Sequence, residues 1–121
     1  MALFADDLVR GIIHTVRKAR RLNQAEKWPT IEAQIQRFRS EDSAHSPRKL
    51  RPVLDYSYQV NGETQYGSAY GVPTAEINRV GDAADNVTTL RVRYDPDNPA
   101  VSQVLGGDNP ELPFGIDYDY F

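Results

Sequence analysis

The chain of 121 residues contains no cysteine and only two histidines. Without cysteine it can form neither a disulfide nor a thiolate metal site, and it has no thiol nucleophile. No apolar run approaches the ~20 residues that a membrane-spanning helix needs. The first residues, MALFADDLVR, carry acid where a secretory signal carries base. We therefore expect a soluble chain that is not exported.

Excess positive charge is also missing, because the formal net charge is -3. Nucleic-acid binding needs a clustered excess of lysine and arginine, so we expect no nucleic-acid partner. The charge is unevenly spread. Residues 1–27 hold six basic and three acidic residues, which leaves the remainder of the chain at a net -6. The two parts are therefore suited to different partners, or to each other.

The first segment has the pattern of an amphipathic helix. Its apolar residues stand three or four apart, and they include Phe4, Leu8, Ile12, Val16 and Ala19. Residues 28 and 29, a tryptophan and a proline, should end this helix because proline cannot donate to the helical ladder. We predict one long helix over residues 1–27.

In the remainder of the chain, apolar and polar residues alternate with a period of two, which is typical of half-buried strands. We expect strands near residues 31–39, 51–60, 63–70, 88–94 and 100–105. Between the third and fourth, a short helix capped by Thr74 and a turn at Gly81-Asp82 fit the pattern. The predicted fold is mainly β (α+β), a small antiparallel twisted sheet or partly closed barrel over residues 28–105. Residues 106–121 form an acidic-aromatic tail, either a docked strand or a flexible end.

The stretch YSYQVNGETQYGSAYG predicts a hairpin. Asn61-Gly62 suits a type I′ turn, in which both central residues need positive φ. A two-residue turn pairs Tyr56 with Gly67, so that the ring can cover the glycine backbone. The row with Leu54, Tyr56, Tyr58 and Val60 is then a core row, and the alternative is a platform for a ligand. We assign structural roles to Tyr56, Gly62 and Gly67.

The stretch YDPDNP carries oxygen ligands of the kind that calcium prefers, but it lacks the glycine and closing glutamate of a calcium loop. We interpret Asp95, Pro96 and Pro99 as a rigid turn between two strands, and we expect no metal and no cofactor. Histidine, serine and acid do not stand together in a packed segment, so no catalytic residue is assigned.

Three motifs in order resemble a bacterial family, the domain-of-unknown-function family 3592. They are WPTIEAQI, VLDYSYQVNGETQYGS and VRYDPDNPAVSQVL, and the resemblance covers about residues 28–105. It implies a domain that commonly stands beside transmembrane helices in bacterial membrane proteins, with no enzymatic activity. In this chain a basic amphipathic helix occupies the place where the family suggests a membrane span.

These observations favour a non-enzymatic binding or structural domain that acts through protein contacts. The basic cluster of the helix is the candidate interaction surface for a protein partner, a second copy of the chain or an anionic membrane, and it consists of Arg17, Lys18, Arg20 and Arg21. The alternative is that the helix packs on the sheet. The expected location is the cytoplasm or the inner face of a bacterial membrane. The competing function is a small-molecule binder or hydrolase with a polar cleft formed by Asp55, Ser68, Arg91 and Arg93.

Overall fold

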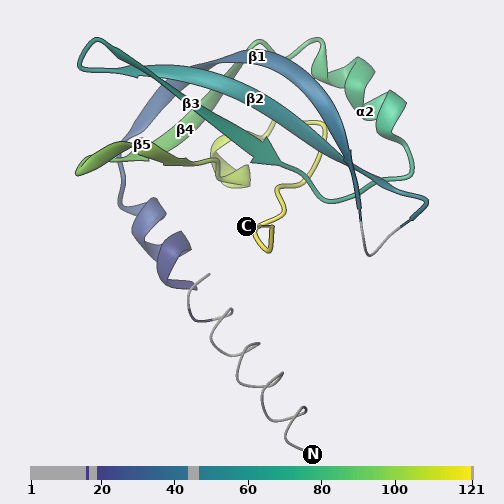
Figure 1. Ribbon diagram of the computed structural model, residues 1–121, viewed down its shortest axis with the longest axis horizontal. Helices are drawn as coiled ribbons and strands as arrows, with labels where there is room; N and C mark the ends of the chain where they lie inside the picture. The colour runs from purple at the N-terminus through teal and green to yellow at the C-terminus, as the bar shows by residue number, and fades with distance from the viewer. Residues whose placement is uncertain (1–15, 17–18, 44–46, 121) are drawn as a thin grey trace, which may run out of the picture.

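The computed structural model describes residues 16, 19–43 and 47–120. Five antiparallel strands form one sheet in the order β3-β2-β1-β4-β5, as Figure 1 shows. The strands are β1 Thr30–Asp42, β2 Leu50–Val60, β3 Glu63–Tyr70, β4 Thr89–Asp95 and β5 Asn98–Gln103. The sheet curls until the two edge strands, β3 and β5, approach each other. The predicted mainly β fold is confirmed, and the sheet is a nearly closed barrel.

Strand β1 forms the corner of this barrel. Its first half pairs with β4, from Thr30 to Gln34, and its second half pairs with β2. The register shifts between Ile35 and Arg37, which leaves an extra residue in β1. A β-bulge of this kind bends a strand and increases its twist. One long strand can therefore serve two parts of a curled sheet.

The hairpin between β2 and β3 has the predicted register. Val60 lies opposite Glu63 and Tyr56 lies opposite Gly67. Asn61 and Gly62 have φ angles of 53° and 80°, so both turn residues are left-handed as a type I′ turn requires. A Cβ atom added at Gly67 would lie 2.5 Å from the Tyr56 ring. The glycine is therefore required by close packing of the ring.

The predicted row of residues on β2 lies in the core. Leu54, Tyr56, Tyr58 and Val60 are all buried. The Tyr56 hydroxyl lies 2.6 Å from Ser102 Oγ, and the Tyr58 hydroxyl donates to the Pro99 carbonyl at 2.6 Å. Both hydroxyls thus find partners on β5, as buried tyrosines need. The rings join β2 to β5 through the interior of the barrel.

The turn between β4 and β5 is formed at Pro96 and Asp97, whereas Pro99, which was predicted to belong to the turn, lies in β5. The Asp95 carboxylate accepts the backbone N–H of Asp97 at 2.9 Å. Pro96 lies in the turn, while β5 already begins at Asn98, two residues before the predicted start. Side-chain oxygen and proline together fix this reversal.

The segment between β3 and β4 contains helix α2, Ile77–Ala84. Thr74 Oγ1 accepts the backbone N–H of Glu76 at 3.0 Å, but the residue at the N-cap is Glu76. The predicted turn at Gly81-Asp82 is wrong, because both residues lie inside α2. A Cβ atom at Gly81 would lie 3.0 Å from the Phe38 ring. The glycine here allows the helix to approach β1 closely.

The two ends of the described chain both contact the barrel. Residues 19–26 are helical, and Ala25 in the last turn is fully buried. Residues 1–15 and 17–18 of the predicted helix lie outside the described residues. The segment after β5 begins with the 3-10 helix η1, Gly106–Asp108, and then returns to the end of β3 (Figure 1). There Ile116 forms a bridge with Gly71, so this tail is docked.

Candidate functional site

The outer face of β1, β2 and β3 carries polar and aromatic side chains around one buried valine, Val53. Inward and outward positions alternate along each strand, so the residues between the core positions point outward. We use the term outer face for Arg37, Arg39, Glu41, Arg51, Val53, Asp55, Ser57, Tyr66, Ser68 and Tyr70. Two of the predicted cleft residues, Asp55 and Ser68, belong to it.

Asp55 lies at the centre of this face. Its carboxylate accepts hydrogen bonds from Arg37 Nε at 2.7 Å, Arg39 Nε at 2.9 Å and Ser68 Oγ at 2.6 Å. Burial alone would raise the pKa of Asp55, but the hydrogen bonds from Arg37, Ser68 and Arg39 outweigh it and lower the pKa to about 2. The carboxylate is therefore ionised at neutral pH, and it binds the Nε of both guanidinium groups, while Arg39 Nη1 also donates to Glu41 at 2.5 Å.

One end of the outer face is covered by the C-terminal segment, and we call it the covered half. Arg51 Nη1 donates to Asp117 Oδ2 at 2.5 Å, and its guanidinium carbon lies 4.2 Å from the centre of the Tyr120 ring. The Tyr120 ring lies 4.3 Å from that of Tyr70, and its hydroxyl donates to Glu41 at 2.9 Å. Charge-assisted bonds and ring contacts thus hold this segment in place.

The other end of the outer face is not covered by the C-terminal segment. We call it the open half, and it consists of Arg37, Arg39, Asp55, Tyr66 and Ser68. Tyr66 is 71% exposed, and the Arg37 side chain is 68% exposed. A cavity of about 540 Å³ lies beside them, with Asp55, Gly67 and Ser68 also among its lining residues. An aromatic ring and an oriented cation therefore border one hollow of the surface.

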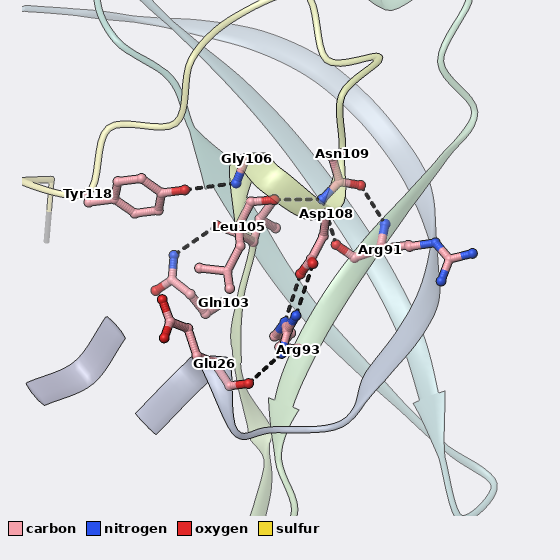
Figure 2. A network of polar contacts seen from close by, with 10 residues as sticks. Glu26, Arg91, Arg93, Gln103, Leu105, Gly106, Asp108, Asn109 and Tyr118 are labelled. Atoms are coloured by element: carbon pink, nitrogen blue, oxygen red, sulfur yellow. Dashed lines mark hydrogen bonds and ion pairs between the residues drawn. The ribbon is translucent and has the colours of Figure 1, made fainter. Parts of the chain in front are cut away.

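The predicted cleft does not form as one site. Asp55 and Ser68 meet in the open half, but Arg91 lines a different cavity, of about 550 Å³. Arg93 is held by Asp108 through bonds of 2.8 and 3.0 Å, and its Nη1 donates to the Glu26 carbonyl at 2.6 Å (Figure 2). The sheet order explains the separation, because β1 stands between β2 and β4.

Asn109 is a structural residue that the sequence analysis missed. Its Oδ1 accepts the backbone N–H of Arg91 and its Nδ2 donates to the Arg91 carbonyl, both at 2.8 Å. Nδ2 also donates to the Leu105 carbonyl at 3.1 Å, as Figure 2 shows. The side chain is buried and completes the edge of β4 where the pairing with β5 has not yet begun. Nothing in the local sequence indicates this distant partner.

A comparison with protein-family models matches residues 28–109 to the Domain of unknown function (DUF3592). The match covers 82 of the 121 residues. The chain belongs to the DUF3592 family. The resemblance seen in the three sequence motifs is thereby confirmed. Comparisons with curated proteins and with solved structures find no match.

The boundaries of the DUF3592 domain divide the outer face. Every residue of the open half lies within the matched range, and so does Asn109. Asp117 and Tyr120, which cover the other half, lie beyond its end. The open half is thus part of the family domain, whereas the cover over the other half comes from the segment that follows it.

The predicted basic cluster is only partly described. Arg20 is exposed, Arg21 is half-buried, and Arg17 and Lys18 lie outside the described residues. Arg21 lines a cavity of about 380 Å³ between β3 and β5, and burial lowers the pKa of its guanidinium. The last turn of the helix packs on the DUF3592 domain. Within the described part of the chain, no helix is long and apolar enough to cross a membrane.

Proposed function

We propose that this DUF3592 domain is a non-enzymatic binding domain that acts through protein contacts, with the open half as its contact surface. The observation that carries the proposal is the exposure of Tyr66, which is 71% accessible although Tyr56 and Tyr58 are buried. Tyrosine and arginine are, with tryptophan, the side chains enriched at the energetic centres of protein interfaces. Tyr66 and Arg37 place one of each at the edge of the same hollow.

The polar groups of the open half support binding better than catalysis. A general base works best with a pKa near the working pH, whereas the pKa of Asp55 is about 2. A carboxylate of such low basicity does not activate the Ser68 hydroxyl that it contacts. Three donors hold Asp55 in place, so its chemistry suits the orientation of Arg37 and Arg39. This favours a contact surface over the competing hydrolase.

The N-terminal helix is the second candidate contact surface. Val16 is 43% exposed and Arg20 is exposed, although Ala25 is buried against the barrel. Two exposed side chains, one apolar and one basic, suit a protein partner, a second copy of the chain or an anionic bilayer. In this proposal the domain works in the cytoplasm or at the inner face of a bacterial membrane.

Photo-crosslinking in the cells that express the chain tests the proposal. A photoreactive phenylalanine analogue is placed in separate variants at position 66, at position 20 on the N-terminal helix, and at position 79 on α2, whose side chain is also largely exposed, as the control. We expect a discrete covalent adduct with a protein from position 66 and none from position 79. Equal adducts from both positions would refute the open half as a specific surface. An adduct from position 20 alone would move the contact to the helix.

A further inference from the structure

The covered half shows which chemistry the outer face can hold. Its ligand is a segment of the same chain, GIDYDY (residues 115–120), in which acidic and aromatic residues alternate. Arg51 takes the carboxylate of Asp117, and Tyr70 takes the ring of Tyr120. One arginine and one tyrosine of the outer face thus contact one acid and one ring, in a segment that backbone bonds to Tyr70 and Val72 also hold.

The open half presents the same pair of groups. Tyr66 and Tyr70 lie on the same face of β3, separated by Ser68. Among the contacts of the described residues, Arg37 uses only its Nε, which donates to Asp55. Its two terminal nitrogens are therefore available, on a guanidinium whose Nε is bound to Asp55 at 2.7 Å. A donor group that is already bound at one atom loses less entropy on binding a ligand than a free side chain does.

The accessible charge of the open half favours an acidic ligand. Arg37 and Arg39 face two carboxylates, those of Asp55 and of Glu41, which pairs with Arg39 at 2.5 Å, so the four groups carry no net charge. The Arg37 side chain, however, is 68% exposed, whereas the carboxylates are 19% and 29% exposed. Arginine binds carboxylates through two parallel hydrogen bonds, and these are stronger than bonds between neutral groups. The exposed ring of Tyr66 adds a flat apolar surface on which another ring can pack.

We propose that the open half binds an acidic-aromatic peptide segment of a partner protein. A carboxylate of the segment is bound by the terminal nitrogens of Arg37, and a neighbouring ring packs on Tyr66. This inference rests on the proposed protein-contact function and specifies the chemistry of the partner. The outer face then holds two segments of the same type side by side, one from its own chain and one from another protein.

A peptide titration tests the inference on the full chain. The probe is acetyl-Gly-Asp-Tyr-Asp-Tyr-Gly-amide, and the control peptide has asparagine in place of both aspartates. We expect the acidic peptide to bind with a Kd of about 1 mM or below, the affinity of a small site worth ~4 kcal/mol. The control peptide should bind at least about tenfold more weakly, since charged hydrogen bonds are lost.

Variants of the protein test whether the peptide binds at the open half. Arg37→Gln should weaken binding about tenfold, and Tyr66→Ala should weaken it by roughly three- to tenfold. Arg91→Gln removes the same charge from an exposed residue of another cavity and should leave the Kd unchanged. Backbone amide shifts in NMR spectra should change between residues 64 and 68 when the peptide is added.

Three results would overturn the inference: no binding at millimolar peptide, equal binding of the asparagine peptide, or amide shifts centred on Tyr70 and Asp117. The last result would mean that the peptide displaces the chain's own segment. A failed titration together with a specific crosslink from position 66 would leave the contact function standing and exclude this partner chemistry. A failed titration without a specific crosslink from position 66 would exclude both the contact function of the open half and this partner chemistry.

Discussion

The two faces of the β2–β3 hairpin share the same strands and the same turn, but their side chains differ in how far they are buried and in what buries them. On the inner face, Leu54, Tyr56 and Tyr58 are uniformly buried. On the outer face, exposure ranges from 0% at Val53 to 71% at Tyr66. Alternation along a strand decides which face a side chain joins. It does not decide what covers that face, which here depends on a segment more than forty residues later in the chain.

The largest expected effect comes from a substitution that disrupts the packing of the inner face. Gly67→Val should lower the free energy of unfolding by about 3 kcal/mol, the upper range for overpacking. The added Cβ would lie 2.5 Å from the Tyr56 ring and 2.8 Å from Ser102 Oγ, and the bond between these two side chains restricts their movement. Intrinsic strand propensity predicts the opposite sign, because valine is favoured in strands.

Urea denaturation measures this loss, with Thr64→Val on the same strand as the control for propensity. Thr64 is exposed, so its replacement should change the free energy of unfolding by no more than about 0.5 kcal/mol. A Gly67→Val chain as stable as the parent would show that the ring does not depend on the glycine.

The next largest effect comes from a substitution that removes contacts in the covered half of the outer face. Arg51→Ala removes the ion pair with Asp117 and the contact with the Tyr120 ring. Both partners of the pair are largely buried, so we expect a loss of about 2 kcal/mol, in the range of charged hydrogen bonds. Limited proteolysis should also release the C-terminal segment earlier. The exposed pair of Arg79 and Glu76 provides the control, because Arg79→Ala should cost less than about 0.5 kcal/mol.

Acid should weaken the outer face before it affects the buried tyrosine contacts. The pKa of Asp55 is about 2 in the folded chain against an ordinary value of 3.8, so the folded state favours the ionised form. Its contribution is complete well above pH 3.8 and disappears as the pH falls through 3.8 towards 2. The shift corresponds to about 2 kcal/mol.

Denaturation curves from pH 7 to pH 2 test this dependence. Asp55→Asn should be less stable than the parent at pH 7 and should lose less stability on acidification. Identical pH slopes for the two chains would contradict the assignment of a low pKa to Asp55.

Most of the fold follows from local patterns. The hairpin register follows from the Asn61-Gly62 turn, and the contact of Tyr56 with Gly67 follows from that register. Asp55 and Ser68 are neighbours for the same reason, since they face each other across the hairpin. Sequence alone could therefore predict the centre of the candidate site.

The remainder depends on partners that are distant in the chain. Gly81 marks close packing of α2 on Phe38, although glycine followed by aspartate locally indicates a turn. Arg93 and Asp108 form a pair because η1 returns to β4, and periodicity carries no information about such a return. The difference between Tyr66 and Tyr70 also depends on a distant partner, because the ring of Tyr120 packs on Tyr70.

The smallest expected effect separates the two tyrosines of the outer face. Tyr66→Ala should change the free energy of unfolding by less than about 0.5 kcal/mol, because a ring that is 71% exposed has little buried area to lose. Tyr70→Ala removes a ring that packs on Tyr120, and it should cost about 2 kcal/mol. Thermal and urea denaturation of the two variants give the comparison directly. Equal losses would mean that the open half stabilises the fold as the covered half does. A neutral Tyr66→Ala would instead mean that this ring is not required for folding, which is the property expected of a side chain that contacts a partner.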